Sequence, residues 1–465
     1  MILIFLLISQ YQFLPAIKVN EDPAGQAFHT TISSGQHSIA ARGDTIYLAY
    51  RGDQTGQANI YFTKSTDGGR TWSPSIRVNY PNQGIFQTLA VSKNGHIFIA
   101  YMDVGEEYTD ISFTKSTDGG RNFSTPIRVN NIRGRHRYPV ITCDTSGAKI
   151  FVGWRNSQGF DIYCSRSTNG GLSFEPEIMV NDTFPPAWQE ALDITCSPSG
   201  ETVYVVWEDN RNCDWDIYFD KSIDGGISFG LDILVNDTNG LTGIDQVHPS
   251  MAIDKKGWIY IVWRDYRDPG KGCYLAKSTD GGNSFCRPVK VSYLDASVDY
   301  PSIAVDDSNG VYVAWEDYGW GPTSKIIFGY SNNAGDTFIQ NIRVDGSQTW
   351  VRCARPTLCI NERKEVFVAW GDCRYDTTYE NYDIFCAKGT KEMPKISEIL
   401  FFKKKITPSF SNPIKNISQL FPKSSLFKIY DIKGNLVKKD KYKKLKKGIY
   451  FLIFDKRIIK IINVE

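Results

Sequence analysis

The stretch STDGGRTW, residues 65–72, decides the fold of this chain because it returns along the sequence with little change. The further copies are STDGGRNF at 116, STNGGLSF at 167, SIDGGISF at 222, STDGGNSF at 278 and a worn copy, SNNAGDTF, at 331. Successive copies begin 51 to 56 residues apart. A fixed period of this length is the mark of a repeat protein, in which each period builds one supersecondary unit.

Seven runs of β-branched and aromatic residues separate these copies, and each run ends in Trp or Tyr. They are IYLAY, IFIAY, IFVGW, VYVVW, IYIVW, VYVAW and VFVAW, beginning at residues 46, 97, 150, 203, 259, 311 and 366. Such residues favour strands, and short apolar runs between turn residues are typical of buried ones. No long segment with helical periodicity appears. The sequence therefore predicts an all-β fold of seven four-stranded units, which is a seven-bladed β-propeller.

A polar turn follows most of these runs, often with the pattern W-x-D-x-R. Its recurring residues are Asp209, Asp265, Asp317 and Asp372, with Arg211, Arg267 and Arg374. Because a recurring feature serves what every unit needs, we expect Asp-to-Arg pairing within or between units. Calcium is an alternative ligand for the carboxylates of Asp209, Asp214 and Asp216, although their spacing matches no known calcium loop. Otherwise we expect no cofactor and no metal, and the five His, none of them in a paired motif, disfavour catalytic zinc.

The segment FLPAIKVN, residues 13–20, repeats the end of a unit whose beginning is missing there. Phe13 precedes Asn20 by seven residues, as Trp72 precedes Asn79 in WSPSIRVN. The last unit, in contrast, departs from the pattern at Gly389, before its own copy of this segment. We therefore predict that the N-terminal strand completes the last blade and closes the ring, which removes exposed sheet edges.

The repeated octapeptide suits a hairpin between the third and fourth strands of each blade. Glycines take positive φ at low cost, an Asp carboxylate accepts hydrogen bonds from turn amides, and the final aromatic ring anchors the turn by burial. We assign a structural role to these residues: Ser65, Asp67, Gly69, Trp72, Ser116, Asp118, Gly120, Phe123, Ser167, Gly170, Phe174, Ser222, Asp224, Gly226, Phe229, Ser278, Asp280, Gly282 and Phe285.

The octapeptide resembles the Asp-box, or bacterial neuraminidase repeat (BNR), of the sialidase-like propeller superfamily, and the resemblance covers nearly all of residues 13–390. It implies that the boxes lie at the end of the propeller opposite the ligand site. The resemblance is specific for the fold and not for an activity. The chain departs from sialidases in lacking an Arg-Ile-Pro sequence and in having seven units where that family has six. No sialidase catalytic residue is therefore carried over.

Residues that break the repeat in the connections at the end opposite the boxes are candidates for ligand binding. Arginines with aromatic neighbours suit a carboxylated or hydroxylated sugar. The candidates are Arg135, His136, Arg137, Tyr138, Trp188, His248, Trp320, Trp350, Arg352 and Arg355, with Tyr318 beside them. Solvated rim residues with no ligand are the alternative.

We expect recognition of extracellular glycans or another surface partner. The alternatives are a glycoside hydrolase (an exo-sialidase or another glycosidase) that acts on extracellular carbohydrate and a non-catalytic surface scaffold. A glycosidase needs two carboxylates, for which Glu190 and Asp245 are the candidates. Neither a phosphate-binding Gly-rich loop nor a nucleic-acid-binding motif is present. We expect no nucleic-acid partner, no transmembrane helix and a monomer.

The charge of the chain changes near residue 390. The net charge of +2 combines about −11 over residues 1–390 with about +13 over 391–465, where Lys dominates. We interpret residues 1–10 as a signal peptide, because ILIFLLI at 2–8 is apolar, residues 11–390 as the propeller and 391–407 as a linker. Alternating strands and a Lys433-Gly434-Asn435 turn predict a small Ig-like β-sandwich over 408–465.

This last region resembles the C-terminal sorting domain of proteins exported by type IX secretion. The resemblance rests on Asn412-Pro413, on IYDIKGNLV at 429–437 and on the GIYF…KIINV ending. It implies secretion or display on the outer surface of a Gram-negative-type bacterium, with the secretion machinery as a partner. An ordinary accessory domain is the alternative. The ten Cys form no CxxC pair, and buried thiols are the simple interpretation.

Overall fold

The computed structural model describes residues 3–7, 10–25, 28–30, 37–182, 187–237, 243–267, 271–293, 297–319, 321–376, 378–392, 427–431, 436–437, 448–454 and 457–463. The chain divides into two compact units, one of Phe13–Gly389 and one of Met1–Gln12 with Thr390–Glu465. The secondary structure of the described residues is all β, without a helix. Accordingly, this part of the chain contains no helix with the length and apolar character needed to span a membrane.

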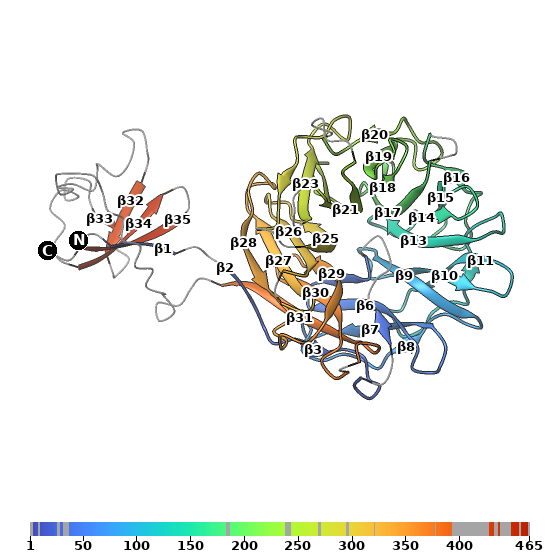
Figure 1. Ribbon diagram of the computed structural model, residues 1–465, viewed down its shortest axis with the longest axis horizontal. Coiled ribbons are helices and arrows are strands. Elements are labelled where there is room, and N and C mark those ends of the chain that lie inside the picture. The colour runs from blue at the N-terminus through green and yellow to red at the C-terminus, as the bar shows by residue number, and fades with distance from the viewer. Residues whose placement is uncertain are drawn as a thin grey trace. The chain divides into compact units, whose positions relative to one another are not determined.

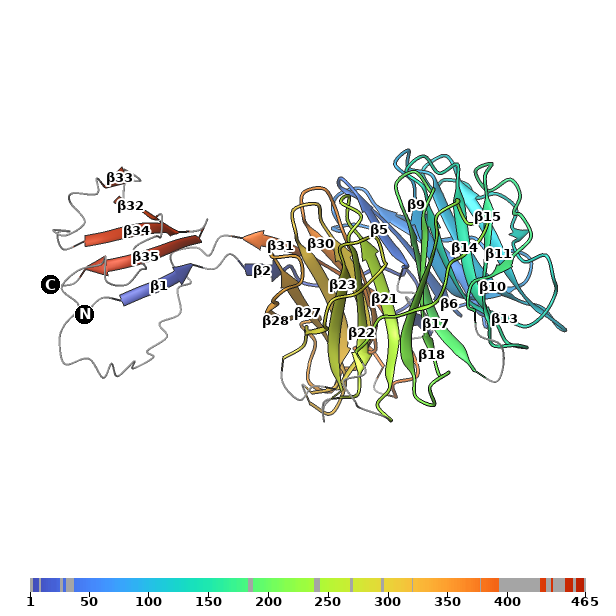
Figure 2. The ribbon, with the colours of Figure 1, turned by 90° about the horizontal axis from the view of Figure 1, so that it is seen from above.

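The larger unit is a seven-bladed β-propeller, as the sequence predicted (Figure 1). Each blade is an antiparallel sheet in which neighbouring strands are joined by short connections, and the strands run between the two ends of the propeller (Figure 2). We number the blades in chain order and call the end with the STDGGRTW-type turns the box end.

The strands of the blades have the following bounds. Blade 1 contains β4 (His29–Thr30), β5 (Ile39–Arg42), β6 (Thr45–Gly52), β7 (Asn59–Ser65) and β8 (Ile76–Arg77). Blade 2 contains β9 (Gln83–Val91), β10 (Ile97–Val104), β11 (Thr109–Ser116) and β12 (Ile127–Arg128). Blade 3 contains β13 (His136–Cys143), β14 (Ile150–Asn156), β15 (Ile162–Ser167) and β16 (Ile178–Met179).

Blade 4 contains β17 (Gln189–Cys196), β18 (Val203–Asp209), β19 (Asp216–Ser222) and β20 (Ile233–Leu234). Blade 5 contains β21 (Gln246–Ile253), β22 (Ile259–Asp265), β23 (Gly272–Ser278) and β24 (Val289–Lys290). Blade 6 contains β25 (Val298–Val305), β26 (Val311–Asp317), β27 (Lys325–Ser331) and β28 (Ile339–Arg343). Blade 7 contains β29 (Cys353–Ile360), β30 (Val366–Asp372) and β31 (Asp383–Glu392), with β2 (Gln10–Phe13) and β3 (Ile17–Lys18).

The first strands of consecutive blades contact one another around the propeller and form its innermost layer. The second strands are buried on both faces, because each blade packs against two neighbours. In β22, for example, Tyr260 and Val262 join a core with blade 6, whereas Ile261 and Trp263 join a core with blade 4. Burial on both faces explains why these strands read as continuous apolar runs.

The N-terminal strand closes the ring, as predicted. β3 pairs antiparallel with β31, with Ile17 opposite Cys386. Asn20 then caps the sheet, since its Oδ1 accepts from the Ile384 N–H at 2.7 Å and its Nδ2 donates to Asp383 Oδ1 at 2.8 Å. In blade 1, Asn79 makes the corresponding bond with the Ile60 N–H at 2.7 Å.

Phe13 takes in blade 7 the place that the box aromatic takes in the other blades. Its ring meets Phe328 of blade 6 edge-on at 5.2 Å, as Phe123 of the second box meets Phe62 of blade 1 at 5.1 Å. A Cβ on Gly389 would come within 2.8 Å of the Phe13 ring. The half-unit at the N-terminus is thus the missing end of the last blade.

Each box turn is held by its own Ser and by an Asp or Asn. Ser65 Oγ accepts from the Gly69 N–H at 2.8 Å, and Asp67 Oδ1 accepts from the Arg70 and Thr71 N–H groups at 3.0 and 2.9 Å. Gly68 and Gly69 both have positive φ. The Thr71 hydroxyl, which donates to Asp67 Oδ2 at 2.7 Å, and these amide hydrogen bonds hold the pKa of Asp67 far below its usual range.

The third box has Asn169 in place of Asp, and its Oδ1 accepts from the Leu172 and Ser173 N–H groups at 3.0 and 3.1 Å. The turn therefore requires an amide-accepting oxygen and not a negative charge. This supports the structural role that we assign to the boxes.

The box turns also join neighbouring blades. In blades 1 to 5, a cation near the end of the third strand donates to a carbonyl in the next turn, as Lys64 does to Gly119 at 2.5 Å, Lys115 to Gly170 at 2.6 Å and Arg166 to Gly225 at 2.9 Å. Because these groups are recruited from adjacent blades, each box turn stabilises the interface between two sheets.

The described strands of the smaller unit form one antiparallel sheet in the order β1 (Leu3–Leu7), β35 (Arg457–Asn463), β34 (Gly448–Phe454), β32 (Phe427–Asp431) and β33 (Leu436–Val437). The apolar segment that we interpret as a signal peptide pairs here with β35. Asn412-Pro413, the Lys433-Gly434-Asn435 turn and most of the linker at 391–407 lie outside the described residues. The predicted sandwich therefore stays a prediction for its second layer.

Replacing Asn20 by Ala should destabilise the whole propeller. The change leaves the buried Ile384 N–H without its acceptor, which costs about 1–3 kcal/mol. Thermal unfolding followed by circular dichroism measures the effect. Asn94→Ala is the control, because Asn94 lies in an exposed turn with one long contact of 3.4 Å. Equal melting temperatures for the two variants would contradict a closing role for Asn20.

Candidate functional site

The innermost strands share an irregularity near the end of the propeller opposite the boxes. Six of them contain a β-bulge, and one residue of each bulge has positive φ although it is not Gly. These residues, which we call the bulge ring, are Phe86, Tyr138, Ala191, His248, Tyr300 and Arg355, with φ between 40° and 57°. Bulges re-aim side chains, and backbone strain of this kind gathers at functional sites.

The bulge-ring side chains of neighbouring blades contact one another. The rings of Phe86 and Tyr138 lie 4.8 Å apart, and His248 stacks on Tyr300 at 4.5 Å. The Arg355 guanidinium lies 5.4 Å from the centre of the Tyr300 ring. Blade 4 differs, because Ala191 places only a methyl group in the ring. The end of the channel opposite the boxes is thus lined by aromatic rings, one imidazole and one guanidinium.

In blades 3 to 6, the residue that follows the Trp of the second strand reaches the bulge of the next blade. The Arg155 guanidinium pairs with Glu190 at 2.9 Å, and Arg264 pairs with Asp299 at 2.8 Å. Glu208 accepts from the His248 N–H at 2.8 Å, and Glu316 accepts from the Arg355 N–H at 3.0 Å. Basic and acidic residues alternate at this position from blade 3 to blade 6. They hold the strained bulges in place from the preceding blade.

His248 lies between two carboxylates. Its Nδ1 is 2.6 Å from Asp299 Oδ1, and its backbone N–H donates to Glu208. Burial alone would lower the pKa of His248, but the hydrogen bond to Asp299 and the charges of Glu208 and Asp299 raise it. Burial opposes ionisation of Asp299 too, yet the His248 bond and the charges of His248 and Arg264 lower its pKa. Burial raises the pKa of Glu208. The site thus holds Asp299, whose lowered pKa keeps it ionised at the imidazole, and Glu208, whose pKa is raised, at the backbone N–H of the same residue.

The positive charges of two arginines act on each other where the last blade adjoins the first. Arg51 is half-buried in β6, and burial lowers its pKa most, the Asp53 carboxylate opposes this effect, and the positive charge of Arg355 lowers the pKa further. In blade 6, burial and the Glu316 carboxylate raise the pKa of Tyr318, whose neighbour Arg352 is exposed. Positive charges at this junction favour an anionic group.

Small polar residues lie two positions deeper in the innermost strands and are buried: Ser38, Thr88, Asp193, Ser250, Ser302 and Thr357. Asp193 Oδ1 pairs across the channel with His37 Nε2 at 2.9 Å, and its Oδ2 accepts from the Met251 N–H at 2.7 Å. Thr357 Oγ1 accepts from the Ser38 N–H at 3.2 Å. A polar layer therefore underlies the bulge ring.

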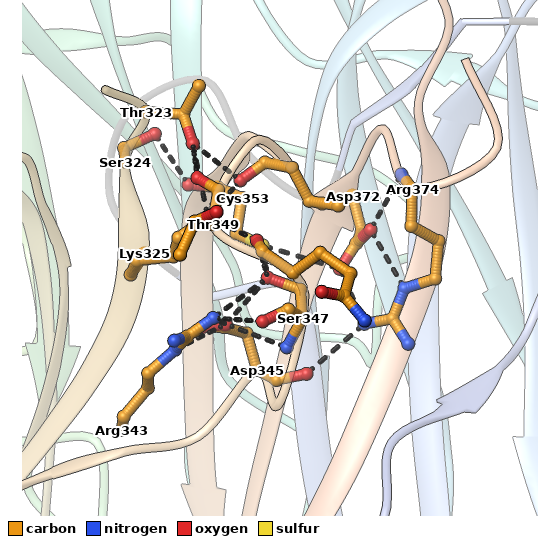
Figure 3. Close-up of polar contacts among 12 residues, drawn as sticks. Thr323, Ser324, Lys325, Arg343, Asp345, Ser347, Thr349, Cys353, Asp372 and Arg374 are labelled. Atoms are coloured by element: carbon orange, nitrogen blue, oxygen red, sulfur yellow. Dashed lines mark hydrogen bonds and ion pairs between the residues drawn. The ribbon is translucent and has the colours of Figure 1, made fainter. Parts of the chain in front are cut away.

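A buried cluster fixes the start of β29, the strand that carries Arg355 (Figure 3). Lys325 is fully buried, and its Nζ donates to the carbonyls of Gln348 at 3.0 Å and of Val351. Ser324 Oγ donates to the Cys353 carbonyl at 2.8 Å, and Cys353 Sγ donates to Asp372 at 3.3 Å. Burial lowers the pKa of Lys325. These contacts explain why a Lys occupies a place that Asp or Asn takes in most other blades.

The candidates around residue 135 take different environments. Arg135 and Arg137 are exposed, whereas His136 is 4 % exposed, with Nε2 2.9 Å from the Ile132 carbonyl and its ring against Trp154. Tyr138 belongs to the bulge ring. His136 is therefore a core residue in this structure, and Arg137 and Tyr138 stay as ligand candidates.

The remaining candidates are divided between the ring and its surroundings. His248 and Arg355 belong to the bulge ring, and Trp188 and Trp350 are 48 % and 39 % exposed. Trp320 lies outside the described residues.

The two predicted catalytic carboxylates take separate partners. Glu190 pairs with Arg155, and Asp245 Oδ1 accepts from the Trp215 N–H at 3.2 Å. The structure does not bring Glu190 and Asp245 together as a pair.

The W-x-D-x-R turns pair as expected. Arg211 binds Asp209 at 2.6 Å, Arg267 binds Asp265 at 2.8 Å and Arg374 binds Asp372 at 2.7 Å. Trp207 Nε1 donates to the same Asp209 at 3.1 Å, so the turn is anchored to the second strand. Asp214 accepts from the Gly243 N–H at 2.7 Å, and Asp216 from Asn236 at 2.8 Å. Within the described ranges, no three His, Cys, Asp or Glu side chains gather as metal ligands.

The sequence analysis did not predict several residues of the site, chiefly Arg264, Asp299, Tyr300 and Glu316. The sequence nevertheless marks three of them. Arg264 and Glu316 occupy the variable position x of W-x-D, and Tyr300 precedes a Pro in an innermost strand. The ligand candidates were predicted in the connections between strands, whereas these four residues lie within strands.

Comparison with known proteins supports the fold. No family model and no curated protein matches the chain. Among solved structures, a protein of unknown function from Dyadobacter fermentans is 15 % identical and has a TM-score of 0.51, covering 83 % of this chain and all of that one. A polysaccharide lyase of family PL25, an ulvan lyase, is 13 % identical with a TM-score of 0.54, covering 77 % of this chain and 94 % of that one. The same type of enzyme bound to -[GlcA(1-4)Rha3S]- is 13 % identical with a TM-score of 0.53, over 80 % and 95 % of the two chains. At these identities the likeness shows a shared propeller fold.

The His248–Asp299 pair should make stability depend on pH. A raised His pKa contributes stability below its ordinary value of 6.5, which is lost as the pH rises through the folded pKa. A lowered Asp pKa contributes stability above its ordinary value of 3.8, which is lost as the pH falls through the folded pKa. The difference in melting temperature between wild type and His248→Gln should therefore be largest between about pH 4 and pH 6.5. His96→Gln, at the box end, is the control, and a difference that does not vary with pH would contradict the pairing.

Proposed function

We propose that this protein recognises acidic glycans at the end of its channel opposite the boxes. The observation that carries the proposal is the position of the Arg355 guanidinium, 5.4 Å from the centre of the Tyr300 ring at this end of the channel. A guanidinium there can donate bidentate hydrogen bonds to the carboxylate of a sugar acid, and the positive charge of Arg51 acts at the same junction between blades. The stacked rings of Tyr300 and His248 lie beside Arg355 and offer a face for a sugar ring.

The comparisons support a carbohydrate ligand in general terms. Two neighbours of this fold with TM-scores above 0.5 are polysaccharide lyases, and one of them holds a saccharide that contains glucuronic acid. Function resides in the site and not in the fold, so the arginines of this chain carry the argument for an acidic ligand.

Replacing Arg355 or Arg51 by Ala should weaken binding of uronic-acid oligosaccharides about tenfold, or about 1.4 kcal/mol. Isothermal titration calorimetry with acidic and matched neutral oligosaccharides measures the effect. Arg121→Ala is the matched control, because Arg121 lies on an exposed turn at the box end. The proposal fails if wild type binds neutral and acidic chains equally, or if the control loses as much affinity as the two variants.

Cleavage of a glycan is a second candidate function. It is favoured by the opposite pKa shifts of Glu208 and Asp299 on either side of His248, since a protonated acid and an ionised base or nucleophile are what glycosidases require. These residues replace Glu190 and Asp245 as the candidates. Incubation with acidic polysaccharides and a reducing-end assay should show turnover that Asp299→Asn abolishes, and mass analysis separates hydrolysis from elimination by the added water. Wild-type protein that binds without turnover would exclude this candidate.

We propose in addition that the protein is exported to the cell surface or the medium, and that the secretion machinery recognises residues 408–465. The apolar start of the chain and the GIYF…KIINV ending support this proposal. A chain lacking residues 408–465 should stay with the cells, whereas the full chain should reach the surface or the medium; equal export of both would refute it.

A further inference from the structure

An exposed aromatic pair lies beside blade 4, outside the bulge ring. Trp188 stacks on Phe160 with ring centres 4.9 Å apart and planes inclined by 21°. Trp188 is 48 % exposed, which is unusual for a ring with so much apolar area. The pair therefore presents a flat apolar face at the end opposite the boxes.

The backbone around Trp188 is fixed. Its N–H donates to Asn210 Oδ1 at 2.7 Å, its carbonyl accepts from the Asn210 N–H at 3.1 Å, and the next N–H donates to the Phe160 carbonyl at 3.0 Å. Phe160 itself has a φ of 63°, a conformation that costs free energy in a non-Gly residue. A rigid exposed ring loses little conformational entropy when a ligand stacks on it.

Polar groups lie at the edge of this aromatic pair. The Arg155 guanidinium is 4.6 Å from the centre of the Phe160 ring and binds Glu190, which is partly exposed. Arg137, opposite Arg155 in the sheet, is exposed. An aromatic face with charged groups at its edge is the arrangement that recognises one apolar face and the polar rim of a sugar ring.

The path from this pair to the bulge ring crosses Ala191. Trp188 and Ala191 are three residues apart at the start of β17, about 10 Å in an extended strand. In the neighbouring blades the corresponding residues are Tyr138 and His248, whose rings occupy this position. The bulge ring is thus lowest in side-chain bulk at the place nearest Trp188.

We propose that Trp188 and Phe160 form a second saccharide subsite, so that the ligand is an acidic oligosaccharide running from the bulge ring over Ala191 to Trp188. This inference rests on the proposed function and adds the length and direction of the ligand. Arg137 and Glu190 contact the sugar that stacks on Trp188.

The test is a length series of uronic-acid oligosaccharides, from two to six sugars, measured by calorimetry. Affinity should rise with length in wild type, and Trp188→Ala should lose about tenfold for the longest chain while the disaccharide is unaffected. Ala191→Tyr should act in the same way by blocking the path, and blade 3 shows that a Tyr is accommodated at this bulge. Tyr293→Ala is the matched control, since Tyr293 is an exposed aromatic residue in the connection between β24 and β25, outside the proposed path.

Affinity that does not depend on length, or that Tyr293→Ala lowers as much as Trp188→Ala, overturns the subsite and leaves the proposed function intact. Loss of disaccharide binding in Trp188→Ala also overturns it, because the ring would then belong to the primary site. Wild type that binds no member of the series overturns the proposed function and the subsite together. Unchanged melting temperatures show that the variants are folded.

Discussion

The whole propeller depends on one sheet that is assembled from the two ends of its chain. A ring of blades that pack face to face has no stable end, because an unclosed ring would expose two apolar sheet faces to water. Val19 is buried in a core with residues of both the last and the first blade, such as Phe367 and Leu48. The short pairing between β3 and β31 therefore secures an interface far larger than itself.

The site follows from this closure. Each strained bulge is held by a residue of the preceding blade, so its geometry requires that blade at its correct distance. Glu316 of blade 6 accepts from the Arg355 N–H of blade 7, and the charge of Arg355 acts on Arg51 of blade 1. Closure of the ring therefore brings the positive charges of two arginines that are distant in sequence to the same junction between blades.

The sequence predicted the fold almost completely, because repetition records what every blade requires. The number of blades, the strand runs, the turns and the closing role of residues 13–20 were all visible in that way. Repetition is a poor guide to a site, which depends on what differs between blades. Tyr300 and Asp299 lie within a strand pattern that looks regular, and only the register shift in β25 shows that they face the channel end. The pairing of Glu190 with Arg155 is another contact between blades that no spacing reveals.

The close approach of Phe13 to Gly389 has a consequence for how the polypeptide can be routed. The chain enters and leaves the ring within one sheet. The contacts between blades therefore do not depend on which blade comes first in the sequence. Joining these two points and opening the chain at another connection between blades would give a circular permutant with the same interfaces. The blades thus form a cyclic arrangement, and their packing does not fix the connection at which the chain is opened.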